Sequence, residues 1–563
     1  MARLPSTLRG APSAPPDVAK GYAGGRLPCI KVLGAFVGDE AACSARICAR
    51  VEEALAPLKK AVQVRDTRQI NVALQVQHEI VRYCANTSLV YFMRTMGPAA
   101  VAAAAGLHDR LVGDALHAIL GTGAATPAER SRAARQARLP VKMGGCGLTL
   151  QSGILDAACV GSWALVWRPL QQLLPQLFAD VNLDEAPQHA FAELRRSRAR
   201  LMETYARVKG VYSKWDVNYY DYDLDGNGKV RYHPEGLPKE KELVPLARFG
   251  TDDDYLKSAQ RRYSSVVLLT DMWGSRDGGR REAIRFIAVS QNGAGAFLNA
   301  VPKLKHFRVP TWAMRIECSR RLGLPLMAVA AAGGRRSRHG MVFDALGDVA
   351  ANDGSGGHQT RHFMINNALY GVLRRVYGGQ VAREPANYAG YSDHRPDMTL
   401  MLDGDLTVLD LKVFDPVGSR PGEAAVRGGH VAFGNTAEAA DAAVLGRCER
   451  GERGKPYNRV TGEGHVEGRR GDYARALANG VRCVPLLVET FGGLGPGLWE
   501  VLRRAADWRQ DKLMSSEYDE TTWAARKFMP FAVQQVSVAV HLAMAEEVAS
   551  ALGLAVGADP RAR

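Results

Sequence analysis

The sequence contains no run of about 18 consecutive apolar residues free of charge, which argues against a membrane-spanning helix. Its first residues, MARLPSTLRGAPSAPP, lack the apolar core of a secretory signal, although their Arg, Ser and Ala content leaves an organelle transit peptide open. The nine cysteines include no Cys-x-x-Cys pair, which argues against a regular zinc site and a disulfide framework. We therefore expect a chain in a reducing compartment, neither secreted nor inserted in a membrane.

Acidic residues are scarcer than basic ones across the 563 residues. Lys and Arg number 73 and Asp and Glu number 58, which leaves a formal charge of +15 at pH 7. Apolar residues make up 46% and charged residues 23%, as in an ordinary folded chain, and this length suggests roughly three or four domains, or fewer large ones. The basic excess suggests a polyanionic partner, for which nucleic acid is the default.

Helical periodicity dominates the first half of the chain. Apolar residues recur at three- and four-residue spacing from Ala41 to Leu120, and Gly121 predicts the end of a helix there. Before these helices, the alternating segment at 29–38 predicts a short buried strand and a turn. The glycines at 137–150 predict a loop.

The character of the sequence changes near residue 330. AAAGGRRSRHG, at 330–340, is basic and rich in glycine, which is typical of a domain boundary. A helical pattern follows at 361–378, and β-type patterns follow at 380–385, 397–414 and 481–490. This order predicts a compact α/β module.

The predicted fold class is α+β and multidomain, with a mainly helical N-terminal half, an α/β domain near the C-terminus and a helical tail. The expected segments are an irregular lead-in at 1–28, a helical domain at 29–169, a helical region at 170–330 with a polar insert at 212–237, the α/β domain at 331–520, and a C-terminal helix and tail at 521–563.

The clearest functional signal is RPDMTLMLDGDLTVLDLKVFDP, at 395–416. Two apolar-rich strands flank an Asp-Gly pair at 403–404, which predicts a hairpin turn. In the second strand, Asp410 and Lys412 are two residues apart and project from the same face. Antiparallel pairing brings Asp397 near Asp410, so we expect two carboxylates and an ammonium at one edge of a sheet.

These residue types suit phosphodiester hydrolysis. The carboxylates of Asp397 and Asp410 offer hard oxygen ligands to Mg²⁺ or Mn²⁺, and Glu384 is a further candidate ligand. Such a metal polarises the phosphate, while Lys412 would activate the attacking water and offset charge in the transition state. The simpler alternative is that Asp410 and Lys412 form a solvated ion pair of little energetic value. Their apolar neighbours predict a largely buried strand, where idle charges are costly.

The Pro-Asp pair, followed thirteen positions later by Asp-x-Lys, resembles the PD-(D/E)XK nuclease superfamily. Other segments stand around it in order: IKVLGAFVG, FMRTMGP, HAILG, LPVKMGGCGL, AACVGSWA, SAQRRYSS, GAGAFLNAVP, CSRRLGLPL, DALGDVAANDGSGGHQTRH and VPLLVETFGG. Together they resemble the C-terminal part of a non-LTR (LINE-like) retrotransposon reverse transcriptase polyprotein with a restriction-like endonuclease. The resemblance extends over about 30–550.

The sequence departs from that family in two places. The reverse-transcriptase palm, with its aromatic-x-Asp-Asp motif, should precede the segment at 30–38, and none is found there, so we expect no polymerase activity. The Cys/His zinc knuckle expected at 341–362 is degenerate, because it lacks cysteine and has Val349 where a His is expected. His358 and His362 alone make a poor zinc site, and we do not expect Zn²⁺.

The resemblance implies a thumb-like helical domain at 29–169, a linker at 170–330 and a restriction-like endonuclease at 331–520. It implies a DNA endonuclease that nicks its target with Mg²⁺ or Mn²⁺. DNA, with element RNA as a further candidate, would be the partner, the location would be nuclear with a cytoplasmic pool, and no membrane would be involved. The first alternative is a catalytically dead, nucleic-acid-binding relic of a retroelement.

Arg-rich segments are candidate phosphate contacts. The candidate residues are Arg335, Arg336 and Arg338 before the motif, and Arg447, Arg450, Arg453 and Lys455 after it. Any one such segment is more often a solvated face. The segment after the motif is the better candidate for a DNA-contacting loop, because it adjoins the nuclease signature.

A calcium site at 223–235 is the second alternative. Asp223, Asp225 and Asn227 match the first, third and fifth positions of an EF-hand loop. The twelfth position, however, is Pro234 in place of the bidentate Glu. A polar turn is therefore favoured over an EF-hand-like Ca²⁺ site.

Overall fold

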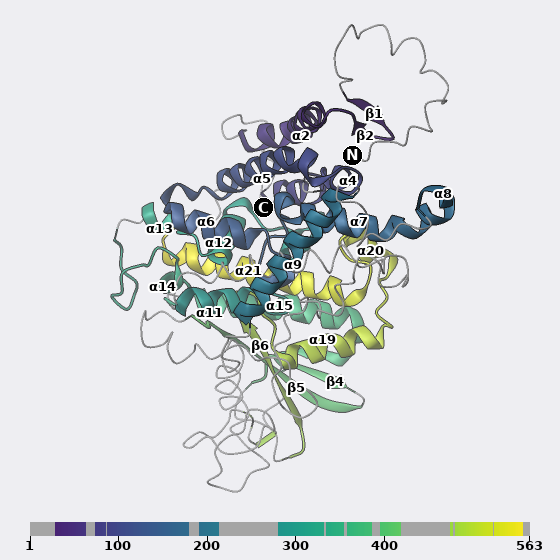
Figure 1. Ribbon diagram of the computed structural model, residues 1–563. Coiled ribbons are helices and arrows are strands. Elements are labelled where there is room, and N and C mark those ends of the chain that lie inside the picture. Colours follow the sequence, from purple (N-terminus) through teal and green to yellow (C-terminus); the bar gives the residue numbers. More distant parts are fainter. Residues whose placement is uncertain are drawn as a thin grey trace.

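The computed structural model describes residues 29–63, 74–85, 87–178, 191–212, 280–331, 334–353, 357–385, 395–402, 404–417, 473, 475–476, 479–521 and 523–554. The lead-in expected at 1–28 lies outside these residues, as does the insert expected at 212–237 apart from Tyr212. The described part is mainly helical and contains a four-stranded mixed sheet toward the C-terminus, which confirms the α+β class (Figure 1).

The N-terminal part consists of helices packed around a shared apolar interior. Its elements are β1 (Ile30–Val32), β2 (Ala35–Val37), α2 (Glu40–Gln63), α3 (Leu74–Glu79), α4 (Val90–Thr95), α5 (Pro98–Leu120), α6 (Pro127–Ala137), α7 (Gln151–Leu173), α8 (Pro175–Phe178) and α9 (Ala192–Tyr212). Helix α5 begins with Pro98, whose fixed φ suits a first turn, and ends before Gly121 at φ +69°, as predicted. Helix α5 packs against α2 and α7, and α7 packs against α9.

The segment at 29–38 differs from the expected buried strand. It forms an antiparallel hairpin of β1 and β2, and the side chains of β1 are exposed. The turn between the strands places Leu33 93% exposed. The alternation in the sequence correctly indicated extended backbone, but only Phe36 and Cys29 reach the core.

The second half of the chain forms the four-stranded sheet and the helices that pack on it. Its elements are α11 (Arg280–Val289), α12 (Thr311–Leu322), α13 (Met327–Ala331), α14 (Asp348–Ala351), α15 (Gly357–Tyr377), β3 (Val381–Arg383), β4 (Met398–Leu402), β5 (Asp405–Phe414), β6 (Arg482–Glu489), α19 (Pro496–Trp508), α20 (Ser515–Thr521) and α21 (Phe528–Ala551). The predicted helix at 361–378 and the predicted β-type segments are therefore confirmed.

The strands lie in the order β3-β4-β5-β6. Strands β3, β4 and β5 pair antiparallel, whereas β5 and β6 are parallel. The hairpin between β4 and β5 turns at Gly404, whose φ of +90° favours glycine. Leu409 and Leu411 face the main core, and Val408 on the other face packs with Tyr473.

Helix α21, within the segment where the sequence predicted a C-terminal helix, lies at the centre of the core. It packs against α12, α14, α15 and α19, and α15 and α19 separate it from the sheet (Figure 1). Among the described helices, α21 is long and apolar enough to cross a membrane, but 78% of its most apolar window is buried inside the protein. Its apolar surface is therefore covered by the other elements of this fold.

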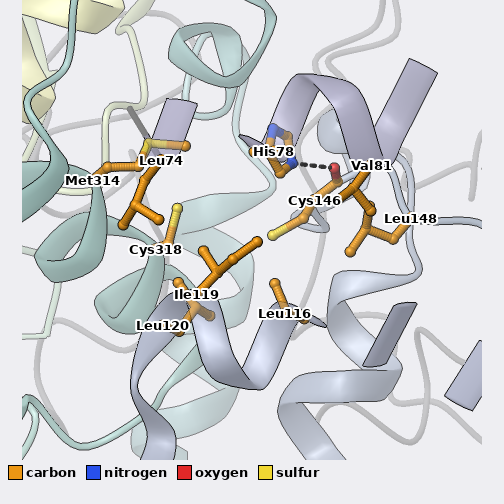
Figure 2. Close-up of a pocket in the computed structure, with 10 residues that line it drawn as sticks. All are labelled: Leu74, His78, Val81, Leu116, Ile119, Leu120, Cys146, Leu148, Met314 and Cys318. Carbon is orange, nitrogen blue, oxygen red and sulfur yellow. Dashed lines mark hydrogen bonds between the residues drawn. The ribbon is translucent and has the colours of Figure 1, made fainter. Parts of the chain in front are cut away.

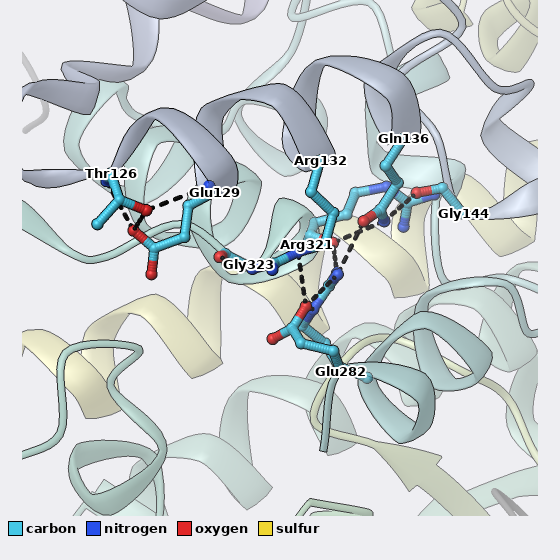
Figure 3. A network of polar contacts seen from close by, with 9 residues as sticks. Thr126, Glu129, Arg132, Gln136, Gly144, Glu282, Arg321 and Gly323 are labelled. Atoms are coloured by element: carbon cyan, nitrogen blue, oxygen red, sulfur yellow. Dashed lines mark hydrogen bonds and ion pairs between the residues drawn. The ribbon is translucent and has the colours of Figure 1, made fainter. Parts of the chain in front are cut away.

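The glycine-rich loop at 139–148 is held by a buried arginine. Arg321 of α12 donates hydrogen bonds to the carbonyl oxygens of Val141 (2.8 Å), Gly145 (3.1 Å) and Ala294 (3.2 Å). Gln136 joins the network by donating to the carbonyl of Arg321 at 2.9 Å (Figure 3). Burial lowers the pKa of Arg321 to about 10, so its guanidinium remains charged at neutral pH.

A small apolar cavity lies between α3, α5 and α12. It is lined by Leu74, His78, Val81, Leu116, Ile119, Leu120, Cys146, Leu148, Met314 and Cys318 (Figure 2). His78 Nε2 lies 3.0 Å from the carbonyl oxygen of Cys146, and burial lowers the pKa of His78 to about 4. The imidazole is therefore neutral, and the cavity presents no charge to a ligand.

The packing of α15 on α21 predicts a large cost for a cavity between them. Leu369 of α15 is fully buried, so Leu369→Ala is expected to lower the free energy of unfolding by about 2–5 kcal/mol. Equilibrium unfolding in guanidinium, followed by circular dichroism, measures this loss. Leu173→Ala, at a position 76% exposed, is the matched control and should change stability by about 0.5 kcal/mol or less. A similar loss in both variants would contradict this packing.

Candidate functional site

Asp397 and Asp410 occupy facing positions on the β4–β5 hairpin. Met398 pairs with Leu409, which places Asp397, one residue earlier, level with Asp410. The backbone N–H of Leu411 donates to Asp397 Oδ2 at 2.7 Å, and this bond holds the carboxylate against β5. The antiparallel pairing predicted from the sequence is the direct cause of this arrangement.

Asp410 is the buried member of the site. Its side chain is 8% exposed, Oδ1 accepts a 2.9 Å hydrogen bond from the hydroxyl of Tyr473, and Oδ2 lies 2.8 Å from Lys412 Nζ. Lys412 is 37% exposed, so the pair opens to solvent on the lysine side. Tyr473 is buried against Val408, and its hydroxyl also orients the carboxylate of Asp410.

His362 is a member of the site that the motif did not reveal. Its Nε2 lies 3.2 Å from Asp397 Oδ2 and 3.3 Å from the carbonyl oxygen of Leu411. The imidazole comes from the first turns of α15, whose opposite face is buried against α21. The only signal in the sequence was its position near the start of a predicted helix, where we had considered it solely as a remnant of a zinc knuckle.

Glu384 does not join the two aspartates. It follows β3 with a φ of +42°, and its N–H donates to the carbonyl of Asp397 at 3.0 Å. Its carboxylate lies 3.6 Å from the guanidinium of Arg395, with both side chains largely exposed. Within the described ranges, no three His, Cys, Asp or Glu side chains converge closely enough to hold a metal by themselves. The expected three-carboxylate ligand set is therefore not assembled here.

The electrostatics of the site follow from burial and from the two neighbouring carboxylates. Desolvation raises the pKa of Asp410 above its usual value, Lys412 opposes this effect, and Asp397 adds to it. The hydrogen bond to Asp397 raises the pKa of His362. The raised pKa of His362 therefore reflects its contact with Asp397, whereas the raised pKa of Asp410 reflects mainly its burial.

Two carboxylates at the open end of the β4–β5 hairpin match the needs of a hard cation. Mg²⁺ is commonly held by one or two carboxylates, with water and phosphate oxygens filling its remaining positions. Asp397 and Asp410 fit that description, because their hydrogen bonds to Leu411 and Tyr473 orient both groups. Mg²⁺ or Mn²⁺ bound here would therefore draw its other ligands from water or substrate.

The basic residues expected to contact nucleic acid are only partly described. Arg335 donates to the carbonyl of Leu552 at 2.7 Å, so its guanidinium is engaged within the protein. Arg336 donates to the carbonyl of Gly340 at 2.7 Å, and the neighbouring Arg338 is exposed. The loop candidates Arg447, Arg450, Arg453 and Lys455 lie outside the described residues.

The two histidines of the segment at 341–362, which was expected to be a degenerate zinc knuckle, contact different partners. His358 Nε2 lies 2.9 Å from Glu547 Oε1, whereas His362 faces Asp397. Val349, at the position where a His was expected, is buried in the core. The calcium candidates Asp223, Asp225 and Asn227 lie outside the described residues.

A comparison of the sequence with protein-family models finds no match, and a comparison with curated proteins finds no significantly similar sequence. The retroelement resemblance therefore remains a prediction.

The contact between His362 and Asp397 predicts a pH-dependent stabilisation. In metal-free protein, His362 should titrate above 6.5, and Asp397→Asn should lower that midpoint because the charged acceptor is lost. The pair's contribution to stability should be complete below pH 6.5 and should disappear as the pH rises through the raised pKa.

NMR of ¹³C-labelled histidine, with His362→Gln to assign the resonance, measures both midpoints. Unfolding at a series of pH values measures the stability. Equal His362 midpoints in the wild type and in Asp397→Asn would show that this contact does not form.

Proposed function

We propose that this protein is a metal-dependent DNA endonuclease that nicks a phosphodiester bond at the end of the β4–β5 hairpin. The observation that carries the proposal is the group formed by Asp397, Asp410 and Lys412, with His362 beside it. A structural ion pair needs only Asp410 and Lys412. It gives no reason for a second carboxylate, that of Asp397, to be oriented beside Asp410. Hydrolysis of a phosphodiester gives each of these groups a role.

The proposed roles follow from the contacts of each side chain. Asp397 and Asp410 would hold Mg²⁺ or Mn²⁺, which when bound polarises the phosphate and lowers the pKa of a coordinated water. Lys412, on the solvent side of Asp410, would orient the attacking water and offset negative charge on the phosphate. His362 is a positioning residue, because it acts by holding Asp397.

The surroundings of these side chains support the roles proposed for Asp410 and Lys412. Tyr473 is 1% exposed and covers the inner side of Asp410, so solvent reaches the pair from the Lys412 side. The carboxylate of Glu384 faces Arg395, which assigns it at most a secondary effect on hydrolysis. The resemblance to a retrotransposon endonuclease points to DNA as the substrate, and the +15 charge favours a polyanion.

A catalytically dead, nucleic-acid-binding relic is the second candidate function. The observation that favours it is the missing third ligand, since Glu384 pairs with Arg395 in place of joining Asp397. The ion pair between Asp410 and Lys412 would then serve only the stability of the sheet. Nucleic acid would still bind, but no bond would be cut.

Nicking of supercoiled plasmid in Mg²⁺ tests the proposal. Asp410→Ala and Lys412→Ala should each lower the rate by about 100-fold or more, because each removes a group assigned to the reacting phosphate. Asp405→Ala, an exposed carboxylate on the same strand, is the matched control and should nick at the wild-type rate. Glu384→Gln should stay closer to the wild type than to Asp410→Ala.

Two results would overturn the assignment. Nicking that survives both Asp410→Ala and Lys412→Ala would place the activity elsewhere or in a contaminant. No nicking by the wild type, together with retained plasmid binding in a gel-shift assay, would establish the relic.

A further inference from the structure

One face of α15 is partly or fully exposed and carries aromatic, polar and basic side chains. Phe363, Asn367, Tyr370 and Arg374 follow one another at spacings of four, three and four residues, so they lie along one side of the helix. Phe363 is 53% exposed, so its ring is accessible to a partner. Leu369, on the other side of the helix, is fully buried.

Arg383, the last residue of β3, completes this face. Its guanidinium carbon lies 5.7 Å from the ring centre of Phe363 and 5.6 Å from that of Tyr370, and it donates to Asn367 Oδ1. Arg374 lies 5.6 Å from the ring centre of Tyr370 and donates to its hydroxyl at 2.7 Å. We call these four side chains, Phe363, Tyr370, Arg374 and Arg383, the α15 platform.

The α15 platform carries two guanidinium groups, Arg374 and Arg383, that no carboxylate of the described residues pairs with. Within the described ranges, both arginines contact aromatic rings and neutral oxygens. Contacts with neutral groups leave the full charge of each guanidinium available to an anionic partner.

The α15 platform adjoins the site formed by Asp397 and Asp410. Phe363 follows His362 directly in the chain, and Arg383 pairs with Met398, the neighbour of Asp397. A ligand lying along the platform would therefore reach the carboxylate group at one end.

We propose that the α15 platform binds an unpaired DNA strand, with a base stacked on Phe363 and phosphates held by Arg383 and Arg374. The inference rests on the proposed function, since the strand would run from the platform into the site of hydrolysis. Alternating rings and guanidinium groups are the pattern by which proteins hold single strands, through base stacking and phosphate contacts.

The chemistry favours an unpaired strand over a duplex. In a duplex the faces of the bases are covered by their neighbours, and only base edges and phosphates are accessible. An exposed phenyl ring has no hydrogen bond to offer those edges, but it matches the π-face of an unstacked base. Stacking on a ring is tolerant of sequence, so little base preference is expected.

Fluorescence anisotropy with labelled oligo(dT), in EDTA to prevent cleavage, tests the inference. Phe363→Ala should weaken binding of the single strand by about tenfold or more, while binding of a duplex of equal length changes little. Phe363→Leu separates stacking from apolar contact. It keeps a bulky apolar side chain without a π-face, so it should lose as much affinity as Phe363→Ala, whereas Phe363→Trp should retain affinity.

The charge contribution needs its own control. Arg383→Gln should weaken single-strand binding and reduce its salt dependence, because one phosphate contact is lost. Arg196→Gln removes the same charge from an exposed position on α9 and should leave binding near the wild type. Circular dichroism and the unfolding midpoint show whether each variant is folded. If Phe363→Ala fails to fold, the bulkier Phe363→Leu carries the test.

The nuclease proposal and the platform proposal can each be contradicted without the other. Wild-type single-strand affinity in Phe363→Leu would overturn the platform while leaving plasmid nicking untouched. Loss of strand affinity in Phe363→Leu, in a protein that never nicks plasmid, would overturn the nuclease and keep the platform as a binding surface.

Discussion

The burial of α21 is the constraint on which the other parts of this fold depend. The helix carries His541 and Glu547 into an apolar interior, and buried polar groups are costly without partners. His541 Nδ1 lies 2.6 Å from Glu317 of α12, and Arg361 of α15 donates to Glu547 at 2.6 Å. Burial raises the pKa of Glu547 to about 7, and the guanidinium of Arg361 opposes that shift. These contacts fix α12 and α15 around α21.

The position of α15 then decides the geometry of the candidate site. Arg361 binds the core through Glu547, and the next residue, His362, faces Asp397. One turn of helix therefore joins the buried interior of the protein to the open end of the β4–β5 hairpin. The same helix buries Leu369 and presents Phe363 outward, so the core, the acidic group and the α15 platform share one rigid element.

Several of the arginines lie inside the protein and serve its structure. Arg285, Arg320 and Arg321 are almost fully buried and bind carboxylates, carbonyls or a ring inside the protein. Their donors hold loops and helix ends together, as the forked geometry of arginine allows. Arg374 and Arg383, beside the sheet, are among the basic side chains that can face a polyanion.

The sequence alone determined those features that depend on neighbours along the chain. Gly121 ended its helix, the Asp-Gly turn set the hairpin, and alternation placed Asp410 and Lys412 on one face, because these are local backbone preferences. Only the tertiary structure could bring His362 and Tyr473 to the site, since each is more than 30 positions from its partner. It also turned Glu384 toward Arg395 and made α21 a core helix, because packing decides which of several compatible surfaces is covered.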